Sequence, residues 1–133
     1  MAAFLDSNVL IDLLAEPSPW QGWSTERLLE WAERGPLIIN DVVYAEVSVG
    51  FGNQADLDRY IDELGIDRVA PDREALFAAG KASRQYRQSG GPRDAVLPDF
   101  IIGAQAERLG IPLITRDGRR FRTYFPGLIL VSP

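Results

Sequence analysis

Short apolar runs alternate with longer amphipathic segments along the chain, and this alternation predicts strands that alternate with helices. The runs with the length and boundaries of buried strands are 2–6, 36–41, 66–70, 111–117 and 128–133. The segments with apolar residues at helical spacing are 7–15, 20–35, 42–52, 53–65, 71–91 and 97–110. This order favours an α/β fold, with a mainly parallel sheet of four or five strands and helices on both faces.

Turn and capping residues mark the ends of several elements. Pro98 falls in the first turn of the last predicted helix, and Gly110 falls at its C-cap. The helix predicted over 42–52 is rich in β-branched residues, which lower helix propensity. We expect a loop over 92–96 and a loop or short helix over 118–127.

The composition fits one globular domain and excludes several kinds of catalytic chemistry. The chain has 133 residues, is 46% hydrophobic and has no repeat or linker, so we expect a single domain over 1–133. The absence of cysteine excludes disulfides and thiolate sites, and the absence of histidine excludes an imidazole base. No apolar run approaches the roughly 20 residues of a membrane span, and the first residues lack a signal peptide's basic region. We expect a soluble cytoplasmic protein with no membrane association.

Charge is distributed unevenly along the chain. The net charge of -5 combines -10 over residues 1–80 with +5 over residues 81–133. The positive charge of the second part comes almost entirely from arginine, whose guanidinium group suits forked contacts with phosphate. A solvated helix face explains the same residues equally well. They are Lys81, Arg84, Arg87, Arg93, Arg108, Arg116, Arg119, Arg120 and Arg122.

Four acids stand at the edges of hydrophobic segments: Asp6, Glu46, Asp99 and Asp117. An acid in an apolar stretch is costly unless it is paired, hydrogen-bonded or metal-bound. All but Glu46 fall at the C-terminal end of a predicted strand or at the start of the next helix. Parallel α/β sheets assemble their binding sites at that edge.

Asp6 and Asp117 both have structural explanations as well. Asp6 could cap the helix that follows it, although Ser7 and Asn8 could perform the same task. Asp117 belongs to an Asp-Gly pair, which is a common turn signal. If their strands are neighbours, Asp117 faces Asp6 across the sheet edge, and Thr115 adds a hydroxyl to the same pocket.

Glu46 lies on a helix face whose other residues favour burial over solvation. They are Val42, Val43, Val49 and Gly50. An edge position that reaches water or an arginine is the alternative. Asp41 is better explained as the N-cap of this helix, and it is a reserve candidate for the site.

Asp99 is favoured by the helix dipole at the start of its helix, which is its structural explanation. Against this, it heads a small apolar face with Ile102, Gly103 and Ala106, opposite the polar surface of Gln105. The small residues would let the helix lie close to the sheet and hold the acid at the sheet's end.

Clustered carboxylates point to divalent metal chemistry. Without metal they repel one another, and some stay protonated. Mg²⁺ or Mn²⁺ prefers such oxygen ligands and can activate water and stabilise charge during phosphodiester cleavage. A metal-dependent phosphodiesterase is therefore the function that these acids favour.

Four segments in this order resemble the PIN domain family, and within it the VapC-type toxin ribonucleases of toxin–antitoxin modules. They are FLDSNVLIDLL at 4–14, DVVYAEV at 41–47, LPDFIIGAQAERLGIPLITRD at 97–117 and FPGLILVSP at 125–133. Two residues depart from the family pattern. Ser7 stands where threonine is more usual, and Phe100 stands where a small residue is more frequent. The resemblance implies a PIN-like three-layer α/β/α sandwich.

The resemblance also implies an active site and an activity. It identifies the chain as the toxin of a toxin–antitoxin pair, a Mg²⁺- or Mn²⁺-dependent endoribonuclease that hydrolyses RNA phosphodiester bonds. Asp6, Glu46, Asp99 and Asp117 would be the catalytic metal ligands, with Asn8 and Thr115 as polar support. Asp94 is interpreted as a loop residue. The arginines expected to contact RNA are Arg84, Arg87, Arg93, Arg116, Arg119 and Arg120.

The family further implies a homodimer and a cognate VapB-type antitoxin, which lies over the toxin and often places an arginine among the acids. Five aromatic residues could supply a groove for an antitoxin helix, or they could pack in the core. They are Trp20, Trp23, Trp31, Phe51 and Tyr60.

Two other functions are alternatives to this one. A phosphoacceptor receiver domain needs paired acids after the first strand and a lysine after a late strand, whereas the only lysine is Lys81 within a predicted helix. A non-catalytic PIN-like module that binds RNA or protein is the remaining alternative, which the intact acids disfavour.

Overall fold

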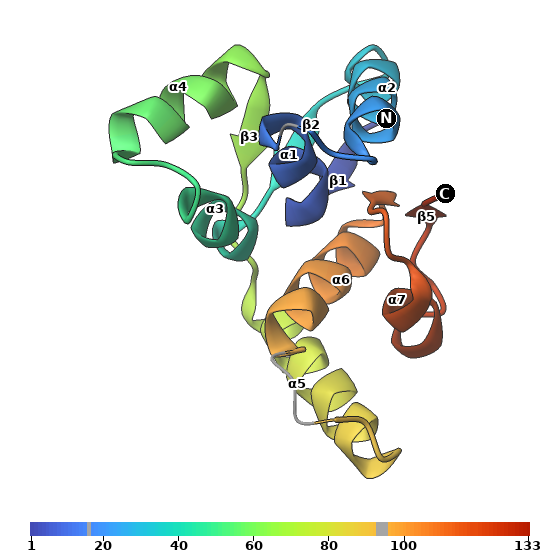
Figure 1. Ribbon diagram of the computed structural model, residues 1–133. Helices are drawn as coiled ribbons and strands as arrows, with labels where there is room; N and C mark the ends of the chain where they lie inside the picture. Colours follow the sequence, from blue (N-terminus) through green and yellow to red (C-terminus); the bar gives the residue numbers. More distant parts are fainter. Residues whose placement is uncertain (16, 93–95) are drawn as a thin grey trace.

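A five-stranded parallel sheet forms the centre of the computed structural model, which describes residues 1–15, 17–92 and 96–133. The strand order is β3-β2-β1-β4-β5, and each pairing is parallel (Figure 1). The prediction of an α/β fold with a mainly parallel sheet is thereby confirmed. The sheet has five strands, the larger of the two predicted numbers. The strands are β1 Ala3–Leu5, β2 Leu37–Ile39, β3 Ile66–Arg68, β4 Leu113–Ile114 and β5 Leu130–Val131.

Helices connect the strands and cover both faces of the sheet, which gives the predicted three-layer arrangement (Figure 1). The segment 118–127, predicted as a loop or short helix, contains a helix, and the helix predicted over 42–52 ends earlier, at Ser48. The helices are α1 Ser7–Leu14, α2 Gln21–Ala32, α3 Asp41–Ser48, α4 Gln54–Glu63, α5 Arg73–Gln88, α6 Leu97–Leu109 and α7 Arg119–Tyr124. None of the helices within the described ranges is long and apolar enough to span a membrane.

Strand β1 lies in the middle of the sheet and fixes the position of the candidate site. All three of its residues are fully buried, and Phe4 is in register with Ile38 on one side and Leu113 on the other. Because β1 and β4 are parallel neighbours, their C-terminal ends meet at one edge of the sheet. The condition under which Asp6 and Asp117 share that edge is therefore met.

Asn40, and not Asp41, caps helix α3. The fully buried Asn40 side chain accepts a hydrogen bond from the Val43 backbone N–H at 3.0 Å. Asp41 is the first helical residue, and its exposed carboxylate lies 2.7 Å from Arg68. Asparagine suits the buried position because its amide can accept and donate without burying a charge.

Gln105 is buried, contrary to the prediction that it lies on the polar surface of its helix. Its amide oxygen accepts from Asn40 Nδ2 at 3.0 Å, and its amide nitrogen donates to the Val69 carbonyl at 3.0 Å. The side chain therefore ties α6 to the ends of β2 and β3. Helical periodicity predicts the wrong environment for Gln105, because its amide oxygen and its amide nitrogen both have hydrogen-bond partners inside the protein.

Gly103 brings α6 close to Phe121 of α7 and to Phe125, which follows α7. A Cβ at this position would lie 2.9 Å from ring atoms of both Phe121 and Phe125. We therefore expect Gly103→Ala to lower the free energy of unfolding by about 1–3 kcal/mol through overpacking, measured by urea denaturation. Gly80→Ala in α5 is the matched control, because nothing lies within 4 Å of its added Cβ. It should stabilise the protein by about 0.5–1 kcal/mol, and equal stability of the two variants would contradict the prediction.

Candidate functional site

Asp6 immediately follows β1 and lies almost fully buried, with 5% of its surface exposed. Its Oδ1 accepts from the Ser7 backbone N–H at 2.8 Å, so Asp6 itself is the N-cap of α1, a task that the sequence also offered to Ser7 and Asn8. Its Oδ2 accepts from Thr115 Oγ1 at 2.8 Å and from Asn8 Nδ2 at 3.3 Å. The two predicted supporting residues thus both contact this carboxylate.

Glu46 reaches the same site from α3. Ser7 Oγ donates to Glu46 Oε1 at 3.0 Å and lies 3.5 Å from Asp6 Oδ1, so one hydroxyl bridges the two acids. Glu46 is half-buried, and Val43 on its helix is buried as predicted. Val49 is 88% exposed, which contradicts the continuous valine face, because α3 ends before it.

Asp99 stands in the first turn of α6, with one third of its side chain exposed. Ile102, Gly103 and Ala106 are buried, which confirms the small apolar face that it heads. Its Oδ2 lies 3.3 Å from Arg120 Nη1 of α7. The position of Asp99 at the sheet edge is thus held by packing along α6 and by an arginine from the next helix.

Asp117 lies at the rim of the site rather than within it. Its backbone N–H donates to Thr115 Oγ1 at 3.2 Å, so one threonine hydroxyl contacts both Asp6 and the Asp117 backbone. The Asp117 side chain is 65% exposed, and its Oδ1 lies 3.6 Å from Arg119 Nε. Asp117 is therefore at the predicted sheet edge but turned toward solvent.

Three carboxylates of the site have raised pKa values, to which their neighbouring charges contribute. Burial raises the pKa of Asp6 to about 7, and the charges of Asp99 and Glu46 contribute to that increase. Burial also raises the pKa of Glu46 and of Asp99, with further contributions from Asp99 on Glu46 and from Asp117 on Asp99. Electrostatic interactions thus link the four acids, and burial is the largest cause of each raised pKa.

The donor chemistry of the site fits a hard divalent cation. The coupled groups are carboxylates, with a threonine hydroxyl and an asparagine amide beside them, and Mg²⁺ and Mn²⁺ prefer such oxygen donors. Over residues 1–15, 17–92 and 96–133, no three acids stand in an arrangement already able to hold a metal ion. Instead, protein groups occupy the carboxylate oxygens: Ser7 contacts Glu46, Thr115 contacts Asp6, and Arg120 contacts Asp99.

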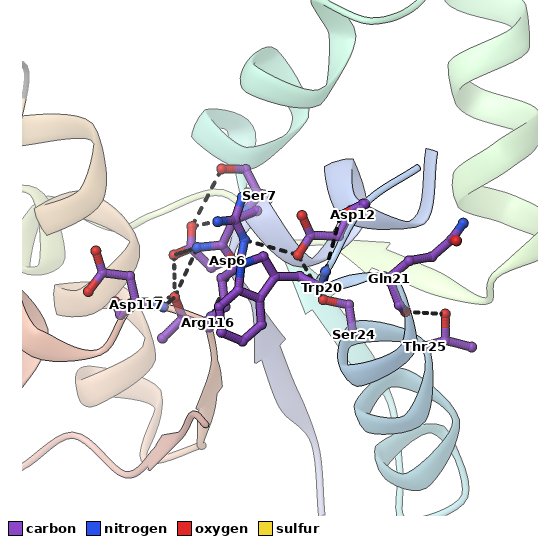
Figure 2. Close-up of polar contacts among 12 residues, drawn as sticks. Asp6, Ser7, Asp12, Trp20, Gln21, Ser24, Thr25, Arg116 and Asp117 are labelled. Carbon is purple, nitrogen blue, oxygen red and sulfur yellow. Dashed lines mark hydrogen bonds and ion pairs between the residues drawn. The ribbon is translucent and has the colours of Figure 1, made fainter. Parts of the chain in front are cut away.

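A second buried acid, Asp12 of α1, was not singled out from the sequence. It is 3% exposed, and its Oδ2 lies 3.0 Å from Arg116 Nε and accepts from Ser24 Oγ at 3.0 Å (Figure 2). The Arg116 backbone N–H also donates to Asn8 Oδ1 at 3.4 Å. The cluster joins α1, α2 and the end of β4, and the signal that reveals it is again an acid within an apolar run.

We expect Asp12→Ala to lower the free energy of unfolding by about 2–4 kcal/mol, because it leaves Arg116 and Ser24 without their buried partner. Thermal or urea unfolding measures the effect. Asp41→Ala is the control: its pair with Arg68 is as short, at 2.7 Å, but half of each side chain is exposed. That control should lose less than about 1 kcal/mol, and a similar loss in both variants would contradict the structural role of Asp12.

The arginines predicted to contact RNA have different environments. Arg116 is paired with Asp12, and Arg120 with Asp99. Arg93 lies outside the described residues, as does Asp94. The exposed members are Arg84, Arg87 and Arg119, the first two on α5 and the third on α7.

The five aromatic residues proposed for a groove are divided between core and surface. Trp31 is buried in the core, which fits the packing alternative. Phe51 and Tyr60 are half-buried and contact each other, with ring centroids 5.6 Å apart. Trp23 is half-buried, and Trp20 at the start of α2 is 37% exposed.

Comparison with known proteins identifies one family and several similar folds. The model of the family described as PIN domain matches residues 3–125. No curated protein matches the chain. A toxin–antitoxin complex from Klebsiella pneumoniae is 26% identical with a TM-score of 0.72, covering 98% of this chain and 97% of that chain.

Two further solved structures share the fold at lower identity. VapBC2 from Rickettsia felis, bound to a promoter DNA fragment, is 18% identical with a TM-score of 0.75, covering 100% of this chain and 99% of that chain. VapC20 from Mycobacterium tuberculosis, a toxin that cleaves the sarcin-ricin loop, is 19% identical with a TM-score of 0.69. It covers 98% of this chain and 99% of that chain.

Proposed function

The chain belongs to the PIN domain family, and on that premise we propose that it is a Mg²⁺- or Mn²⁺-dependent endoribonuclease, the toxin of a toxin–antitoxin pair. The observation that carries this proposal is the coupling of Asp6, Glu46, Asp99 and Asp117 at one edge of the sheet. Burial raises the pKa of three of these acids, so a bound cation would favour their charged forms. The carboxylate oxygens of all four acids would be the metal ligands.

The protein's own groups would hold the ligands in place. Thr115 and Asn8 orient the Asp6 carboxylate, and Ser7 fixes Glu46 beside it. A bound Mg²⁺ or Mn²⁺ would supply an activated water and stabilise charge on the phosphate. Since the chain has no histidine, the acids themselves are the groups that would accept protons from that water.

Contacts with an antitoxin are favoured by an apolar groove beside Glu46. Ile11 and Leu14 of α1 and Val49 after α3 are exposed around this groove. The Klebsiella pneumoniae structure is that of a toxin–antitoxin complex, and we extend the partner, a VapB-type antitoxin, to this chain. Apolar side chains of the antitoxin would fill the groove and place the antitoxin next to the acids. We further propose a homodimer, which light scattering of the purified protein tests.

The alternative function is a non-catalytic PIN-like module that binds RNA or protein. Its specific support is the ion pair between Arg120 and Asp99, in which an arginine stands where the enzyme would place a cation. The two functions differ in their response to metal. Titration calorimetry with Mn²⁺ should give saturable binding to the enzyme, and no binding would favour the module.

Expression in cells provides the direct test of the activity. RNA 5′ ends are sequenced after expression of the wild-type chain and of the Asp99→Asn variant at matched protein levels. New 5′ ends in the wild-type sample alone are expected, and they would also identify the target RNA. A wild-type sample with the same 5′ ends as cells that do not express the chain would exclude the ribonuclease function.

A further inference from the structure

An open polar pocket adjoins the acid site at Asp117. Its volume is about 390 Å³, and it shares Arg116 and Asp117 with the residues described above. The residues that matter for recognition are Trp20, Arg116, Asp117, Arg119, Arg122 and Ser132. They come from the start of α2, the end of β4, helix α7 and the C-terminal segment, which the fold brings together.

Arginine gives this pocket its charge. Arg119 has 88% of its side chain exposed, and its contact with Asp117 is long, at 3.6 Å. Arg122 Nη2 donates to the neutral Ser132 hydroxyl at 2.9 Å, so this interaction leaves its charge uncompensated. Exposed guanidinium groups in this state are suited to phosphate, which they bind through forked hydrogen bonds.

Trp20 supplies an aromatic surface to the same pocket. It precedes the first residue of α2, and 37% of its surface is exposed. Figure 2 shows its indole together with Arg116 and Asp117. The contacts of Asp12 with Arg116 and Ser24 connect α2 to the end of β4, which fixes the tryptophan relative to the acids. A large, half-exposed aromatic side chain held in this way is a platform for a nucleobase.

We propose that this pocket is a subsite for one nucleotide of the RNA, next to the scissile phosphodiester. The base stacks on Trp20, and the adjacent phosphate contacts Arg119 and Arg122. Asp117 lines the subsite and stands at the rim of the acid site, so the chain of the RNA continues from one to the other. The substrate class rests on the proposed ribonuclease function, whereas the pocket, its charge and its aromatic wall do not depend on metal.

Binding of RNA without metal tests the subsite separately from catalysis. A fluorescein-labelled single-stranded RNA of about ten nucleotides and mixed sequence is titrated in EDTA and followed by anisotropy. Trp20→Ala should weaken binding by about 5-fold to 100-fold, and Trp20→Phe should retain most of the affinity. Arg122→Gln should weaken binding and lower the slope of log affinity against log salt by about 0.7. Arg59→Gln on α4, an exposed arginine outside the pocket, is the matched control.

The outcomes distinguish the subsite from the proposed function. Unchanged RNA affinity in Trp20→Ala and Arg122→Gln, in a protein that cleaves RNA, would overturn the subsite and leave the ribonuclease intact. Weakened affinity in both variants, in a protein that cleaves nothing, would support the subsite and exclude the ribonuclease. Loss of antitoxin binding with unchanged RNA affinity would assign the pocket to the protein partner and overturn the proposal. Circular dichroism verifies that each variant is folded.

Discussion

Asp99→Asn is expected to reduce Mg²⁺-dependent RNA cleavage by about 100-fold or more, with the fold unchanged. The substitution removes the charge that a metal ligand supplies but preserves the shape of the side chain. Asp99 contributes to the raised pKa of both Asp6 and Glu46, so it stands at the centre of the coupled site. Cleavage of a labelled RNA with and without Mg²⁺ measures the effect.

Asp41→Asn is the matched control for this experiment. Asp41 is also in the first turn of its helix and is also paired with an arginine, but that pair is exposed and Arg68 belongs to β3. The control should cleave RNA at the wild-type rate. Metal-dependent cleavage retained by a folded Asp99→Asn variant would remove Asp99 from the catalytic site and weaken the whole assignment.

Position along the chain predicted which acids lie near one edge of the sheet, but not the environment of each one. Asp6 and Asp117 are close only because β1 and β4 are neighbours, and strand order depends on packing that periodicity does not encode. The sequence also offered no way to see that Asp117 turns toward solvent. That orientation follows from Thr115, whose hydroxyl holds the Asp117 backbone and Asp6 together.

Errors in the sequence interpretation arose where polar side chains found internal partners. Helical spacing predicts that Gln105 lies on the face opposite the apolar one, yet Asn40 and a backbone carbonyl bind its amide inside the protein. Asp12 lies within an apolar helix pattern that gives no sign of its partner, because Arg116 pairs with it from more than 100 residues away. Such pairings join distant segments, so they become visible only once the fold is known.

The metal-free protein is expected to become less stable as pH rises from 5 to 8. The pKa of Asp6 is raised from 3.8 to about 7 in the folded state, so near pH 5 the folded protein keeps a proton that the unfolded chain releases. The proton on Asp6 therefore contributes fully to the free energy of unfolding below about pH 4, and this contribution is lost as the pH rises through 7. The raised pKa values of Glu46 and Asp99 act in the same direction.

Asp6→Asn isolates this effect, because its amide does not titrate. Between pH 5 and 8 the wild-type protein in EDTA should lose about 2–3 kcal/mol of unfolding free energy relative to this variant, measured by urea denaturation at each pH. Mg²⁺ should restore wild-type stability at pH 8, where the carboxylate is charged, and should have little effect at pH 5. It should not stabilise Asp6→Asn at either pH. Parallel curves of unfolding free energy against pH for the two proteins would show that the pKa of Asp6 is not raised in the folded state. Curves that diverge as the pH rises, and that Mg²⁺ brings together again, would connect the buried charge of Asp6 directly to metal binding.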